Sequence, residues 1–121
     1  ARKARLRGAG QHEAALRHAD SAYDLLGIPR ELCDVVDTPT LAGMLRDPER
    51  MRAAAQLFWE EGRIFTAKGD PLTSFARYRR ALELFIEARA VEPHQDDDNS
   101  ILELSRVVHA KHLDPVYRED F

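Results

Sequence analysis

FWEEGRIFTAKGDPLTSFARYRRA, residues Phe58 to Ala81, contains two helical patterns separated by a turn. Gly69 suits the left-handed position that follows a helix, and Asp70 with Pro71 suits the N-cap and first residue of the next one. Apolar residues recur at helical spacing on both sides of this turn. We therefore expect helices at about 48–68 and 71–91 that fold back on each other as an antiparallel pair.

Both helices of this pair carry wide apolar faces. The first is apolar over more than half of its circumference, so it is expected to lie between neighbours. Glu61 falls inside that apolar arc, where a carboxylate needs a partner, and Arg77 or Arg89 on the following helix are the candidates. An exposed pair between Arg79 and Glu83, four residues apart, is expected on the outer side. The predicted core positions are Met51, Ala54, Ala55, Leu57, Phe58, Ile64, Phe65, Phe75, Tyr78, Ala81, Leu82, Phe85, Ile86 and Ala88.

Upstream of the pair, the sequence predicts helical segments with a break between them. The basic stretch 1–7 has no N-cap and resembles the end of a helix, so native N-terminal residues are expected to be missing. Gly8 to Gly10 are predicted to end that segment, and a second helix is expected over 11–26. Its inner face is small, with alanines at 15, 19 and 22, which allows close approach by another helix. Gly27 and Pro29 mark its end, with Ile28 folding back.

The remaining segments are shorter. Residues 30–36 read as an irregular connector with Cys33, Val35 and Val36 tucked under the helices. Thr38 with Pro39 predicts the start of a short helix to about 45, and Asp47 with Pro48 predicts the start of the long one. Ser100 and Glu103 form a possible capping box for a last helix to about 112. The prediction is an all-α fold of about five to six helices, in one domain covering residues 1–121.

Composition limits the classes of protein that fit. A chain of 121 residues can bury a core without metals or disulfides, and its single cysteine, Cys33, permits no internal disulfide. That cysteine content fits a reducing compartment, so a cytoplasmic location is expected. No apolar run approaches the length of a membrane helix, so no membrane association is predicted. The net charge of −3 offers no overall attraction to nucleic acid.

One set of residues in the central pair follows a known pattern: Phe58, Gly62, Phe65, Gly69 with Asp70, Ser74, Tyr78 and Ala81. At this spacing the chain resembles the tetratricopeptide repeat family. Gly10, Ala15, Ala19 and Ala22 offer half of another repeat, whereas residues 28–47 depart from the family's tandem spacing. The chain is also similar to a group of uncharacterised bacterial helical proteins with an additional N-terminal helix. The resemblance implies a right-handed array of helix pairs and no cofactor.

The resemblance also implies a binding role, in which a peptide or helix of a partner protein lies in a groove between helix pairs. Trp59 lies at the border of the apolar arc, beside Arg52 and Arg63. A tryptophan there either packs under an arginine or serves as a half-exposed anchor for a partner. We take Trp59, Arg52, Arg63 and Arg77 as the candidate binding residues.

Catalytic and metal-binding patterns are weak. His94, Asp96, Asp97 and Asp98 lie before the last predicted helix, whereas His109 and His112 lie at its end, about 14 Å away. This separation argues against one metal site, so no metal is predicted. Because no catalytic trio, phosphate-binding loop or HExxH motif is present, we do not expect an enzyme.

Two alternatives to partner binding stay open. An incomplete first repeat leaves an uncovered helix face, which favours a homodimer or a purely structural oligomerisation module. A nucleic-acid role would use the basic cluster of Arg2, Lys3, Arg5 and Arg7 together with Arg77, Arg79 and Arg80. Salt-sensitive binding would be the signature of that second alternative.

Overall fold

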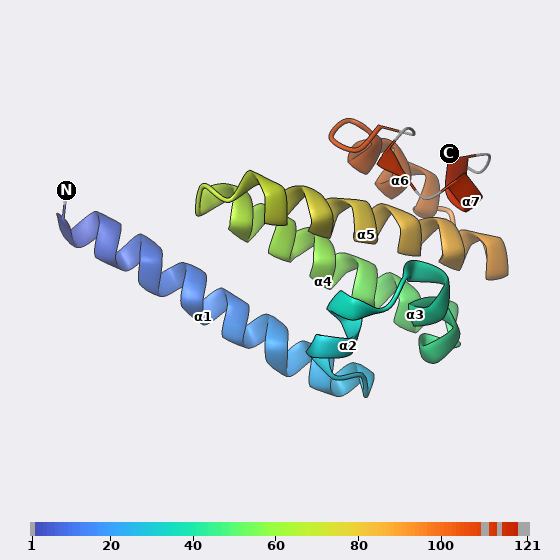
Figure 1. Ribbon diagram of the computed structural model, residues 1–121, viewed down its shortest axis with the longest axis horizontal. Coiled ribbons are helices and arrows are strands. Elements are labelled where there is room, and N and C mark those ends of the chain that lie inside the picture. Colours follow the sequence, from blue (N-terminus) through green and yellow to red (C-terminus); the bar gives the residue numbers. More distant parts are fainter. Residues whose placement is uncertain (1, 110–111, 114, 119–121) are drawn as a thin grey trace.

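A computed structural model describes residues 2–109, 112–113 and 115–118. Its centre is the predicted antiparallel pair, formed by α4 (Pro48–Ala67) and α5 (Pro71–Val91). Helix α1 (Arg2–Leu26) lies along α4, and α6 (Asp97–Ser105) lies on α5, so four helices form a layered array (Figure 1). Two short helices, α2 (Arg30–Val35) and α3 (Thr38–Leu45), join α1 to α4. A four-residue helix, α7 (Pro115–Arg118), follows α6. The all-α prediction is confirmed.

Aspartate caps begin three consecutive helices. Asp47 accepts a hydrogen bond from the amide of Glu49 at 2.8 Å, and Asp70 accepts one from the amide of Thr73 at 3.2 Å. Both of these caps follow the sequence prediction. The third cap differs from the prediction. Asp37, and not Thr38, caps α3 by accepting a hydrogen bond from the amide of Thr40, so Thr38 is the first residue of the helix. Gly27 and Gly69 have positive φ angles, as their helix-ending positions require.

The predicted break at Gly8 to Gly10 is wrong, because α1 is continuous from Arg2 to Leu26. A glycine in a helix interior costs only about 1 kcal/mol relative to alanine and does not forbid the helix, as proline would. The half repeat expected around Gly10 therefore lacks its turn. The buried face of the second part agrees with the prediction, with Ala19, Tyr23 and Leu26 in the core.

Three further predictions are wrong. Residues 30–35 form helix α2 in place of an irregular connector, and Val35 is exposed. Helix α6 begins at Asp97 and ends at Ser105, so Ser100 and Glu103 lie inside it and form no capping box. Glu83 is buried and accepts a hydrogen bond from the hydroxyl of Thr38, so the exposed pair with Arg79 is not formed. The last two errors arise where a contact between distant residues overrides a local pattern.

The nesting of α4 and α5 depends on small residues, as predicted. Gly62 is buried, and a Cβ at this position would lie 2.6 Å from Cε1 of Tyr78. Ser74 on α5 donates a hydrogen bond to the carbonyl oxygen of Gly62 at 2.7 Å, which requires close backbone approach. Ala81 and Phe58 are buried in the same interface, and Phe65 is half-buried. The core cluster includes residues from Tyr23 on α1 to Tyr117 on α7.

Candidate functional site

Trp59, the first candidate binding residue, is buried, with 9% of its surface exposed. Its indole meets the ring of Phe85 edge to face, with the ring centroids 6.0 Å apart. The guanidinium carbon of Arg63 lies 4.9 Å from the centroid of the indole. Trp59 is therefore packed under an arginine and against α5. Of the two roles considered for Trp59, this is the structural one.

Arg52 holds α4 against α6. Its guanidinium makes two hydrogen bonds to the carboxylate of Asp97, at 2.8 and 2.9 Å, and a further one to the carbonyl oxygen of Glu92. The amide of His94 also donates to Asp97. Burial raises the pKa of Asp97, but the bonds from Arg52 and His94 outweigh it and hold this pKa below its usual value. Arg52 thus joins α4 to α6 and to the segment that precedes α6.

Arg77 lies beside the buried carboxylate of Glu61. Glu61 is fully buried, and its Oε2 lies 4.0 Å from Nε of Arg77. The guanidinium of Arg77 also lies 5.8 Å from the ring centroid of Phe58. Of the two arginines predicted as partners, Arg77 is the one that lies beside Glu61, whereas Arg89 pairs with Asp98 at 2.9 Å.

The sequence did not indicate the second partner of Glu61, which is the hydroxyl of Tyr23 on α1. This hydroxyl donates a hydrogen bond to Glu61. Nothing in the local pattern of α1 distinguishes that tyrosine from an ordinary core residue.

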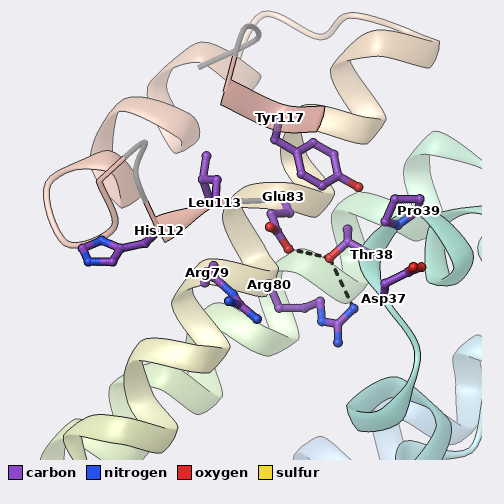
Figure 2. Close-up of a pocket in the computed structure, with 9 residues that line it drawn as sticks. All are labelled: Asp37, Thr38, Pro39, Arg79, Arg80, Glu83, His112, Leu113 and Tyr117. Atoms are coloured by element: carbon purple, nitrogen blue, oxygen red, sulfur yellow. Dashed lines mark hydrogen bonds between the residues drawn. The ribbon is translucent and has the colours of Figure 1, made fainter. Parts of the chain in front are cut away.

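A polar pocket lies where α3 and the C-terminal segment meet α5 (Figure 2). Thr38 donates to Glu83 at 2.6 Å and accepts from Arg80 at 3.2 Å, which joins α3 to α5. The hydroxyl of Tyr117 donates to Glu87 at 2.7 Å and holds the C-terminal segment over the same helix. The pocket has a volume of about 200 Å³. Its lining consists of Asp37, Thr38, Pro39, Arg79, Arg80, Glu83, His112, Leu113 and Tyr117.

These contacts divide α5 into two halves with different surroundings. From Ala81 to Ile86, six consecutive residues are buried. Figure 1 shows α3, α6 and α7 beside this C-terminal half. In the N-terminal half, Pro71 to Arg80, Leu72 is 84% exposed and Ala76 and Arg79 are also exposed. We call residues 71–80 the open half of α5.

Two concave surfaces flank the open half of α5. The apolar groove has a volume of about 360 Å³ and is lined by Thr66, Gly69, Pro71, Ser74, Phe75, Tyr78 and Val107. The arginine face has a volume of about 370 Å³ and is lined by Leu72, Thr73, Ala76, Arg77, Arg79 and Arg80. The two surfaces adjoin along Leu72, Phe75 and Arg79, which are neighbours on a helix at spacings of three and four. Of the four predicted binding residues, Arg77 alone lines either of these two surfaces.

The residues considered for a metal lie in separate places. Asp97 is bound to Arg52, and the rings of His109 and His112 have centroids 6.0 Å apart. The ring of His112 also meets Phe75 edge to face, with a centroid distance of 5.0 Å. Within residues 2–109, 112–113 and 115–118, no three side chains of metal-ligand type are grouped closely enough to hold an ion.

The chain matches no family model, no curated protein and no solved structure in the three comparisons. Among the helices of the described residues, none combines the length and the apolar character needed to cross a membrane. The geometry of the open half of α5 is thus the principal guide to function.

Proposed function

We propose that this chain is a helical protein-interaction module that binds an amphipathic helix of a partner protein across the open half of α5. In this role the chain performs no catalysis. Its buried charged groups join helices to one another: Glu61 joins α1, α4 and α5, Asp97 joins α6 to α4, and Glu83 joins α5 to α3. These networks set the spacing of the helices and thereby the shape of the surface that binds.

The observation that carries the proposal is the contrast between the two halves of α5. Residues 81–86 in the C-terminal half are all buried, whereas the open half presents the apolar groove and Leu72. Ten residues of helix extend about 15 Å, which matches about three turns of a partner helix laid alongside. An amphipathic helix recognises such a groove by inserting apolar residues from one face. The resemblance to tetratricopeptide repeats supports a binding role in the same way, by analogy.

Selection from a displayed peptide library tests this proposal. Random peptides long enough for about three helical turns are panned against the purified chain. Enriched peptides are expected to lose binding to the Val107→Glu variant, because Val107 lines the apolar groove and a charge there opposes the insertion of apolar side chains. Val107 is 51% exposed, so the new carboxylate stays in solvent and does not destabilise the fold.

Leu102→Glu is the matched control, since Leu102 lies on α6, is 59% exposed and is not among the residues that line the groove. Peptides enriched on the wild type are expected to bind this control unchanged. If no peptide is enriched, or if both variants bind equally well, the groove is not a binding site.

Self-association is the competing use of the same surface. Light scattering distinguishes the two roles, because a module that binds a different partner stays monomeric at high protein concentration. If the wild type is a dimer and the Val107→Glu variant is a monomer, the groove is the site at which a second copy of the chain binds.

A further inference from the structure

The proposed function leaves open what kind of helix binds, and the charge of the open half of α5 bears on that question. The segment PLTSFARYRR, residues 71–80, contains three arginines and no acidic residue, in a chain whose net charge is −3. All three arginines line the arginine face. Glu61 lies beside Arg77, and Asp37 and Glu83 line the polar pocket with Arg80, so exposed Arg79 contributes most of the positive charge beside the surface proposed to bind a partner.

Two of the three arginines are held in place by the fold. Arg80 donates to the hydroxyl of Thr38 at 3.2 Å, and Arg77 lies beside Glu61 on α4. Arg79 is exposed and lines the same surface. Arginines whose positions are already set lose less conformational entropy on binding than freely rotating ones. The arginine face is thus a prearranged positive surface.

The arginine face continues into the polar pocket of Figure 2, because Arg79 and Arg80 line both. Asp37 and Glu83 line that pocket too, so a partner carboxylate is expected to meet the arginines from the arginine face, which no acidic residue lines, in the planar geometry that guanidinium groups offer to carboxylates. The opposite edge of the face is apolar, with Leu72 84% exposed and Ala76 beside it.

We infer that the partner helix is acidic: its apolar side enters the groove at Phe75 and Tyr78, and its flanking carboxylates meet Arg79 and Arg80. This inference rests on the proposed function, because it concerns the same surface. An alternating apolar and basic surface of this kind fits a protein helix better than nucleic acid. Phosphate backbones are bound by extended basic surfaces, and a prominent exposed leucine adds nothing to such binding.

Two synthetic helical peptides of about three turns test the inference. Both carry leucines at positions i, i+3, i+4 and i+7, and they differ only in having Glu or Gln at the flanking positions. The acidic peptide is expected to bind the wild type about tenfold more tightly in fluorescence anisotropy, since a few surface ion pairs together supply that difference. The preference is expected to shrink as salt is added.

Arg79→Glu should abolish the preference for the acidic peptide, whereas Arg17→Glu, the same charge change at an exposed position of α1, should retain it. Equal binding of the Glu and Gln peptides, both sensitive to Val107→Glu, would overturn the acidic partner and leave the binding module intact. Binding of neither peptide would also overturn the acidic partner, and the library selection alone would then decide the proposed function. Tighter binding of a DNA or RNA oligonucleotide that displaces the acidic peptide would overturn the inference in favour of a nucleic-acid role.

Discussion

At the scale of single residues, the space beside Gly62 controls how closely α4 and α5 approach. A methyl group there would lie 2.6 Å from Cε1 and 2.7 Å from Cδ1 of Tyr78, well inside normal contact distance. The ring of Tyr78 lies against the core and also lines the apolar groove. The residue that allows the helices to nest thus also positions one wall of the proposed binding surface.

Gly62→Ala is expected to destabilise the chain by about 1–2 kcal/mol, because the overpacking outweighs the gain in helix propensity. Gly43→Ala is the control, since no atom lies within 4 Å of a Cβ at that helical position. There the propensity gain acts alone and should stabilise the chain by up to about 1 kcal/mol. Urea unfolding followed by circular dichroism measures both variants, and stabilisation by both would contradict the nesting of Tyr78 on Gly62.

The sequence predicts which residues occupy the core better than which polar contacts they make. The sequence identifies Glu61 as a buried carboxylate because it breaks an apolar arc, and Arg77 is one of the two partners that it predicts for Glu61. Tyr23 was not recognised as the other partner, since a tyrosine on an apolar face gives no sign of what its hydroxyl contacts. Trp59 was a reasonable anchor by residue type, but periodicity places it only at a border, and its burial depends on Phe85 and Arg63.

At the scale of elements, boundaries set by local chemistry were predictable and those set by distant contacts were not. The starts of α4 and α5 follow from Asp-Pro pairs whose aspartates cap their own helices. The continuity of α1 through Gly8 to Gly10 and the start of α6 do not follow from such signals. Helix α6 begins at Asp97, whose carboxylate is held by Arg52, 45 residues earlier in the chain. No local pattern contains that contact.

The bond between Arg52 and Asp97 predicts how acid affects the docking of α6. Because the pKa of Asp97 is lowered in the folded chain, its contribution to stability is present above the unfolded value, near pH ~4, and is lost as the pH falls through the folded value. Asp97→Asn should therefore lose less stability than the wild type between pH ~6 and ~3 in urea unfolding. Asp98→Asn removes a neighbouring carboxylate that is 83% exposed and serves as the control for loss of a surface charge. Equal acid sensitivity of the wild type and Asp97→Asn would exclude this pair as a source of the effect.

At the scale of the whole molecule, α5 is the helix around which the others are arranged. It contacts α4, α3 and α6, and Glu87 on it holds the C-terminal segment through Tyr117. Within the open half, His112 contacts Phe75 and Thr38 contacts Arg80, and this half presents an apolar groove on one side and arginines on the other. We propose that a partner helix completes the array there.

The most direct test of this account is a backbone nuclear magnetic resonance titration of the labelled chain with the acidic helical peptide. If a partner helix binds across the open half of α5, the shifted amide resonances gather there, at Phe75 and Arg79, and at Thr66 and Val107 across the groove. Amides of Leu102 on α6 and Leu25 on α1 should stay unchanged. Shifts centred on α1 or α6, with the open half of α5 unaffected, would contradict it.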